Sequence, residues 1–202
     1  MTNNFSKIRE LLEFENENTF YFIQILQRRK ENPEMARGVR VIDNFYLYSV
    51  EDLDKLEPKI IEACTKYNAR AYIKLNRLDL EKVALYCQKK TIDLLIQGEY
   101  KAVKNVYPTV CGKFSDAGKD KKWIVDIDED ELEYKDKIVE IINDIHSKVT
   151  KKNYKIVAEL PTKSGIHIIT NPFNVKEFND RLEELGVKIE VKKNNPTILF
   201  CL

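Results

Sequence analysis

Two aspartates in the segment from Trp123 to Asp128 could hold a divalent metal ion. The segment reads Trp-Ile-Val-Asp-Ile-Asp, a short pattern typical of a β-strand. Side chains alternate across a strand, so Asp126 and Asp128 share one face, roughly 6.5 Å apart along the backbone. Carboxylate oxygens suit Mg²⁺ and Mn²⁺, so we expect both residues to be metal ligands. Alternatively, they are surface aspartates that precede the acidic first turn of a helix.

A second chemical element surrounds His167, one of two histidines in the chain. It lies on an expected strand that begins after Lys163, Ser164 and a glycine. A lysine, a serine and an imidazole can all donate hydrogen bonds to phosphate oxygens. The alternative is a half-buried strand histidine bonded to a neighbouring carbonyl, and the sequence leaves both interpretations open.

The expected fold class is α+β, with an N-terminal α/β lobe over residues 1–110 and a second lobe over 111–202. Alternating patterns and helix-capping signals in the first lobe predict a helix at 4–15, strands at 19–26 and 39–48, a helix from Ser49, a strand at 69–75 and a helix from Asp79 to about 97. Pro58 should kink or restart the helix that begins at Ser49. Residues 99–122 show no clean period, and the lobe boundary is placed there.

The second lobe reads strand, helix, strand, strand, helix, strand, with one added strand. This order is the ferredoxin-like or RRM-like arrangement. The expected elements are the strand at 122–128, a long helix with an apolar stripe from 138 to 149, a hairpin at 154–160 and 166–170, a helix from Asn174 with Leu185 on its buried face, and a terminal strand pair at 187–192 and 197–202.

Composition limits the classes of function. The chain has 202 residues, 34 basic and 33 acidic side chains and a formal charge of +1, so no global field favours nucleic acid or an anionic membrane. No segment has the length of a membrane helix or the pattern of a signal peptide, and the four cysteines form no Cys-x-x-Cys pair. We therefore expect a cytoplasmic protein without a membrane partner, whose cysteines are reduced and pack in the core.

The two chemical elements together resemble the archaeo-eukaryotic primase superfamily. Members carry an Asp-x-Asp strand, then a Ser-x-His strand, then a third acidic residue on a later strand, and the order here is the same. The resemblance implies that Asp126, Asp128 and Glu190 are the catalytic, metal-binding carboxylates for Mg²⁺ or Mn²⁺. It implies that His167 contacts the phosphates of an incoming nucleotide.

The resemblance further implies a metal-dependent nucleotidyltransferase that joins nucleoside triphosphates on a single-stranded nucleic-acid template, with a helicase or another replication protein as partner. Two features depart from the family pattern. Two residues separate Ser164 from His167, and Glu190 stands where the family has aspartate. Positive side chains should steady the triphosphate and template, and the candidates are Lys163, Lys122, Lys74, Arg77 and the lysines of the loop from 113 to 121.

Two other functions remain open. Asp126 and Asp128 with Glu190-x-Lys192 have the composition of a metal-dependent nuclease, in which a carboxylate and a lysine flank the scissile phosphate. An RRM-like sheet can also bind nucleotide or nucleic acid without catalysis.

Overall fold

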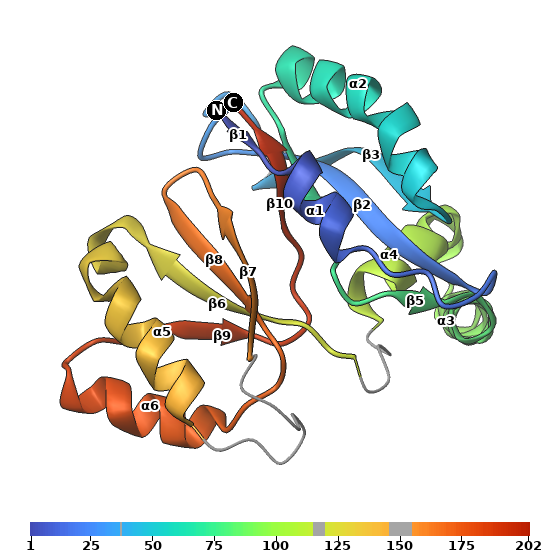
Figure 1. Ribbon diagram of the computed structural model, residues 1–202. Helices are drawn as coiled ribbons and strands as arrows, with labels where there is room; N and C mark the ends of the chain where they lie inside the picture. Colours follow the sequence, from blue (N-terminus) through green and yellow to red (C-terminus); the bar gives the residue numbers. More distant parts are fainter. Residues whose placement is uncertain (37, 115–119, 146–154) are drawn as a thin grey trace.

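The computed structural model describes residues 1–36, 38–114, 120–145 and 155–202 (Figure 1). The fold is α+β, as predicted. In chain order the strands and helices are β1 (Thr2–Asn3), α1 (Phe5–Leu11), β2 (Thr19–Arg28), β3 (Val39–Leu47), α2 (Val50–Tyr67), β4 (Arg70–Ile73), β5 (Leu78–Asp79), α3 (Leu80–Ile96), the 3₁₀ helix η1 (Tyr100–Asn105), α4 (Val106–Lys113), β6 (Trp123–Asp128), the 3₁₀ helix η2 (Glu129–Tyr134), α5 (Lys135–Asp144), β7 (Ile156–Pro161), β8 (Gly165–Thr170), α6 (Val175–Glu184), β9 (Glu190–Lys192) and β10 (Thr197–Cys201).

The strands form two antiparallel sheets. The first has the order β1-β10-β4-β2-β3, with β5 paired to β2, and the second has the order β7-β8-β6-β9. The second sheet and its helices follow the chain order β6-α5-β7-β8-α6-β9. This is the ferredoxin-like arrangement that the sequence predicts.

The predicted pairing of the last two strands is wrong. β9 pairs with β6 in the second sheet, whereas β10 lies between β1 and β4 in the first sheet. All five residues of β10 are buried, so this strand needs neighbours on both edges and cover on both faces. The segment Asn194-Asn195-Pro196 is therefore a crossover between sheets and not a hairpin turn. After β9 the chain returns to the first sheet, so the segment 111–202 includes one strand of that sheet. The lobe boundary between residues 110 and 111 stays a prediction.

The two sheets share a hydrophobic core. Val125 and Ile127 pack with α5 and α6, as their alternation predicts, while Ile124 on the opposite face joins the core of the first sheet. Leu160 and Ile169 of the second sheet belong to that same first core. The face of β6 that carries the aspartates therefore looks toward the first sheet, so residues of β10 can reach it (Figure 1).

Local capping agrees with the sequence at three helices. Ser49 and Asp52 form the predicted capping box of α2, the Asp79 side chain accepts from the backbone N–H of Lys82 at 2.9 Å, and that of Asn174 accepts from Glu177 at 3.3 Å. α2 runs through Pro58 without restarting, contrary to one of the two expected outcomes. Proline removes only one backbone donor, and burial of residues such as Leu53 and Ile60 keeps the helix together.

Other expectations need correction. The stretch at 99–122 contains η1, which has no buried residue, and α4, which has only three, too few to give a clear period. α5 ends at Asp144, and Val149 lies outside the described residues. α6 ends at Glu184, so Leu185 is 36% exposed and not on a buried helical face. Three of the four cysteines are buried, which agrees with packing in the core.

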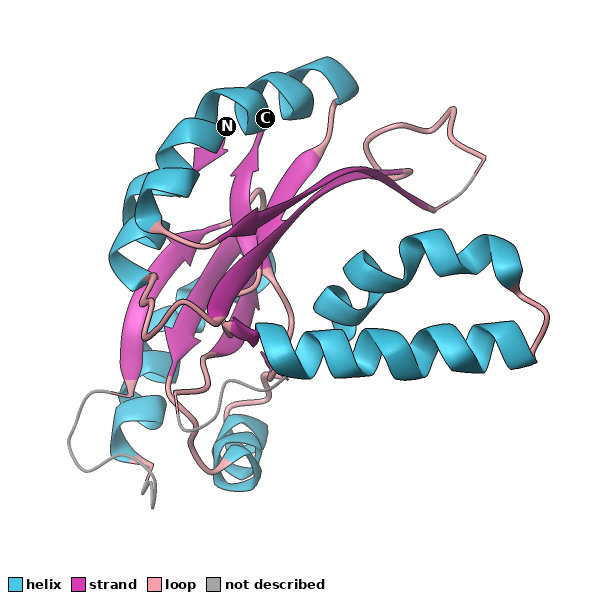
Figure 2. Cartoon of the chain, turned by 90° about the vertical axis from the view of Figure 1, so that its right-hand side faces the viewer, coloured by secondary structure: helices cyan, strands magenta, loops and turns pink. Residues whose placement is uncertain are grey.

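α3, η1 and α4 form a helical projection beside the sheets. Figure 2 shows α3 lengthwise, with η1 and α4 running back along it. In the described part of the chain every helix is too short or too polar to cross a bilayer. A cytoplasmic location stays a prediction.

Candidate active site

Three strands of the second sheet bring Asp126, His167 and Glu190 to one face. In the β6–β8 pair Asp126 lies opposite His167, and in the β6–β9 pair it lies opposite Glu190. Directly opposed residues of antiparallel strands present their side chains on the same face. The central position of β6 therefore assembles residues that are far apart in the sequence.

Both oxygens of the Asp126 carboxylate have partners. Oδ1 lies 3.1 Å from Nε2 of His167, and Oδ2 accepts from Nζ of Lys192. The hydrogen bond from His167 holds the pKa of Asp126 down, burial opposes this effect, and Lys192 adds to it, so the pKa falls to about 2. Asp126 is therefore an ionised carboxylate at neutral pH, although its side chain is only 18% exposed.

His167 connects the two sheets. Its Nδ1 lies 2.8 Å from Oγ1 of Thr197, the first residue of β10, and both side chains are buried. An ionised Asp126 can only accept, so Nε2 of His167 carries a proton. In the neutral imidazole Nδ1 is then the acceptor, and the Thr197 hydroxyl donates to it. Both ring nitrogens are thus occupied inside the protein.

Lys192 supplies a positive charge between two carboxylates. Besides Asp126, its Nζ lies 3.5 Å from Oε2 of Glu190, whose side chain is 71% exposed. Burial lowers the pKa of Lys192, but the bonds and charges of Asp126 and Glu190 outweigh burial and raise it above the ordinary value. The Lys192 ammonium is therefore charged at neutral pH, and the carboxylates of Asp126 and Glu190 hold it between them.

Asp128 lies at the open end of the same strand face. It is exposed, and its backbone N–H donates to the Glu131 carboxylate at 3.0 Å where η2 begins. Gly165 lies opposite Asp128, and a Cβ at that glycine would be 2.1 Å from the carbonyl oxygen of Ile127. Only glycine lets β8 approach β6 this closely, and the exposed Lys163 and Ser164 lie in the turn just before it.

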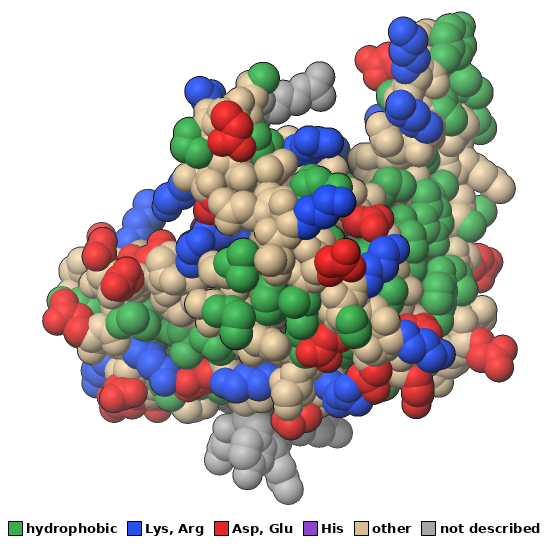
Figure 3. Space-filling model, turned by 90° about the horizontal axis from the view of Figure 1, so that it is seen from above, with side chains coloured by type: hydrophobic (Ala, Val, Ile, Leu, Met, Phe, Trp, Pro, Cys, Tyr) green, Lys and Arg blue, Asp and Glu red, His purple; other side chains and the backbone are tan. Residues whose placement is uncertain are grey.

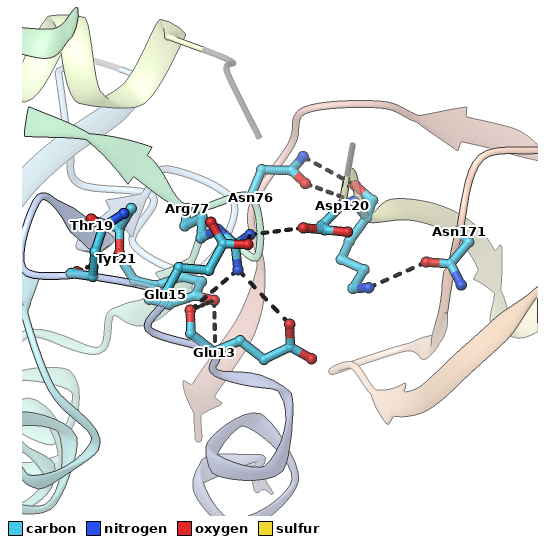
Figure 4. A network of polar contacts seen from close by, with 10 residues as sticks. Glu13, Glu15, Thr19, Tyr21, Asn76, Arg77, Asp120 and Asn171 are labelled. Carbon is cyan, nitrogen blue, oxygen red and sulfur yellow. Dashed lines mark hydrogen bonds and ion pairs between the residues drawn. The ribbon is translucent and has the colours of Figure 1, made fainter. Parts of the chain in front are cut away.

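The other predicted cations do not gather around Asp126. Nζ of Lys122 donates to Oδ1 of Asn171 at 3.2 Å, and its backbone N–H donates to Asn76 (Figure 4). Lys74 is buried, and its ammonium donates to the carbonyls of Cys111 and Gly112, each at 3.1 Å, and to that of Phe114. It neutralises the C-terminal end of α4, and burial lowers its pKa to about 8.

Arg77 is held by three carboxylates. Its guanidinium pairs with Asp120 at 2.8 Å, with Glu13 at 3.8 Å and with Glu15, and the side chain is only 11% exposed (Figure 4). These contacts fasten the segment before β6 to the first sheet. The roles of Arg77, Lys74 and Lys122 at a nucleotide stay predictions, and the structure gives each of these side chains partners other than Asp126.

The sequence did not show the part that three residues play in the site. Thr197 follows the expected turn at Asn194-Asn195-Pro196, and no local pattern marks its hydroxyl as a partner of His167. The sequence suggests that the glycine at 165 lets the backbone approach a ligand, whereas its close approach is to β6 and depends on the strand register. Lys192 was considered only for the nuclease alternative, yet it is the direct partner of Asp126.

The three carboxylates have the oxygen atoms that a hard divalent ion prefers, but a lysine already pairs with two of them. Asp126 and Asp128 lie on the same strand face, and Glu190 lies opposite Asp126 on β9. The Lys192 ammonium lies between Asp126 and Glu190. Among the described residues, no three His, Cys, Asp or Glu side chains converge on a common point. A metal ion at Asp126 must therefore displace Lys192.

Comparison of the chain with protein-family models, with curated proteins and with solved structures returned no match.

Proposed function

We propose that this chain is a metal-dependent nucleotidyltransferase of the primase-polymerase type, which joins nucleoside triphosphates on a single-stranded template. The observation that carries the proposal is the meeting of Asp126, His167 and Glu190 on one face of a ferredoxin-like sheet. The three residues come from its first, third and fourth strands in chain order. The primase-polymerase resemblance implies the same order of motifs on the same arrangement of elements.

Asp126, Asp128 and Glu190 are the residues that would hold Mg²⁺ or Mn²⁺. Such an ion supplies charge stabilisation to the attacking and leaving oxygens of a phosphoryl transfer. His167 then acts by orientation, because its Nε2–H fixes the carboxylate of Asp126 and Thr197 fixes the imidazole. Contact of His167 with a phosphate, as first predicted, requires Nε2 to leave Asp126.

Lys192 would take a second position if the site held a divalent ion. Asp126 would then hold the ion in place of the ammonium, and Lys192 would be free to pair with a phosphate oxygen of a nucleotide. Lys163, exposed in the turn before Gly165, adds a further positive charge at the Asp128 end of β6. A triphosphate that arrives with one divalent ion still carries net negative charge, and the ammonium of Lys192 and that of Lys163 would partly offset it.

One observation favours a second candidate, a metal-dependent nuclease. Lys192 pairs with both Asp126 and Glu190, and a carboxylate pair with a lysine is the combination that such enzymes use. The nuclease alternative gives no task to the bond between His167 and Asp126, and for this reason we place it second.

The test is extension of a primed single-stranded template with labelled nucleoside triphosphates and Mg²⁺ or Mn²⁺. We expect extended products from the unchanged chain and none from Asp126→Asn. Asp130→Asn is the matched control, because this exposed aspartate lies two residues beyond β6. Cleavage of the strand without triphosphate, lost in Lys192→Ala, would instead establish the nuclease.

A further inference from the structure

A groove between α3 and α4 has the chemistry of a binding site and is separate from Asp126. Its volume is about 440 Å³. It lies on the helical projection, whose upper side carries basic, acidic and hydrophobic side chains (Figure 3). The lining residues are Tyr86, Lys89, Lys90, Asp93, Thr109, Val110, Lys113 and Phe114.

The groove has an aromatic surface that is open to solvent. The rings of Tyr86 and Phe114 pack with centroids 4.8 Å apart, at 55° to each other. Tyr86 is nevertheless 52% exposed, so Phe114 supports one side of its ring and leaves the rest accessible. A supported, exposed ring is a surface on which a nucleobase can stack.

Positive charges flank this aromatic pair. Lys89 and Lys90 follow Tyr86 by three and four residues, so they share its face of α3, and Lys113 lies across the groove on α4. Asp93 is the acidic lining residue, which leaves the groove with an excess of positive charge. Aromatic rings with lysines along a groove are the combination that binds single-stranded nucleic acid without sequence preference.

The groove adjoins the candidate active site. Nδ2 of Asn194 donates to the carbonyls of Lys113 and Phe114, at 3.2 and 3.5 Å. Asn194 follows Lys192 by two residues, a separation that spans at most about 7 Å along the chain. A strand that leaves the groove at Phe114 is therefore close to the residues around Asp126.

We propose that this groove binds single-stranded nucleic acid, with a base stacked on Tyr86 and phosphates on Lys89, Lys90 and Lys113. Its use as the template site rests on the function proposed above. Strand binding itself requires neither nucleotide nor metal. The two proposals can therefore fail separately.

The test is fluorescence anisotropy of a labelled single-stranded oligonucleotide of about 16 nucleotides, titrated with the full chain at several salt concentrations without metal or triphosphate. Tyr86→Ala should weaken binding by about 5- to 150-fold, and Tyr86→Phe should leave it within about twofold. Lys89→Gln with Lys90→Gln should reduce the steepness of log K against log salt by about 1.4.

Matched controls come from the same projection, outside the groove. Tyr100→Ala removes an aromatic ring that is 68% exposed, and Lys101→Gln with Lys104→Gln removes two lysines that are exposed on η1. We expect both variants to bind as the unchanged chain does. Equal losses in the control and groove variants would overturn the proposal, because binding would then follow surface charge or exposed rings in general.

Two further ligands separate this proposal from its alternatives. The unchanged chain should bind an abasic strand more weakly than a normal strand. Tyr86→Ala should bind the two strands with equal affinity. Polyglutamate of matched charge should not compete, and effective competition would reassign the groove to an acidic peptide. If the unchanged chain binds the strand as described but does not extend a template, the groove assignment stands and the proposed catalysis fails.

Discussion

His167 and Asp126 face each other across β8 and β6, with Nε2 of the imidazole 3.1 Å from Oδ1 of the carboxylate. On the other side of the ring, Nδ1 meets the hydroxyl of Thr197, which begins a strand of the first sheet. Asp126 is therefore held by an imidazole whose other ring nitrogen is bonded to the first sheet. A carboxylate fixed in this way is suited to binding a charged partner in one defined orientation.

Asp126→Asn should lower the free energy of unfolding by about 2 kcal/mol at pH 7, and the difference should shrink as the pH falls. The pKa of Asp126 lies at about 2 in the folded chain and at the ordinary value of 3.8 in the unfolded chain. A depressed carboxyl pKa stabilises the fold above the unfolded value, and this stabilisation is lost as the pH falls from about 5 through 2. Urea unfolding at several pH values measures it.

Asp128→Asn is the control for that series. Asp128 is exposed on the same strand face, so its replacement should change the unfolding free energy by less than about 0.5 kcal/mol at any of these pH values. A stability gap for Asp126→Asn that stays constant down to pH 2 would mean that the ionised carboxylate is not the source of the effect.

Lys192→Met should strengthen Mn²⁺ binding by about 10- to 100-fold, because a metal ion then has no ammonium to displace from Asp126 and Glu190. The measurement is titration calorimetry or the electron paramagnetic resonance of free Mn²⁺ at pH 7. Lys188→Met removes a nearby exposed charge that precedes β9, and it should change the affinity far less. Equal affinities in all three proteins would exclude Asp126 as a ligand.

Periodicity alone predicts the parts of this site that local geometry decides. Alternation along β6 places Asp126 and Asp128 on one face, and the order of elements gives the ferredoxin-like sheet that carries His167 on its third strand. Contacts with partners that are distant in the sequence were not predicted. Lys74 follows a strand end, and the sequence does not show that its ammonium donates to the last carbonyls of α4.

Dependence on partners that are distant in the sequence also explains why the pairing of the last two strands was predicted wrongly. Thr197 to Cys201 has the composition of a strand, but composition does not say which sheet has an open position for it. The gap between β1 and β4 decides this, and it exists only when the first sheet is assembled. The hydroxyl partner of His167 could not be predicted without that placement.

Thr197→Val should disconnect the imidazole of His167 from the first sheet. Valine has nearly the same shape as threonine but no hydroxyl, so Nδ1 loses its hydrogen-bond donor while Nε2–H still meets Asp126. We expect the ¹⁵N resonance of Nδ1 to shift in Thr197→Val and to stay in Thr197→Ser. Burial of an unpaired nitrogen should also cost about 1–3 kcal/mol of stability. An unchanged spectrum in the valine variant would contradict the assigned tautomer and its bond.

Gly165→Ala should be the most damaging small substitution near the site. The added Cβ would lie 2.1 Å from the carbonyl oxygen of Ile127, on backbone that cannot move without separating β8 from β6, and the glycine φ of +157° is one that other residues rarely adopt. We expect a loss of roughly 2–5 kcal/mol, measured by urea unfolding. Gly112→Ala is the matched control, because a Cβ there meets open space within α4 and alanine favours a helix. It should leave stability unchanged or raise it by up to about 1 kcal/mol. If Gly165→Ala proved as stable as Gly112→Ala, the register that places His167 opposite Asp126 would be wrong, since that register is what brings Gly165 against Ile127 and Asp128.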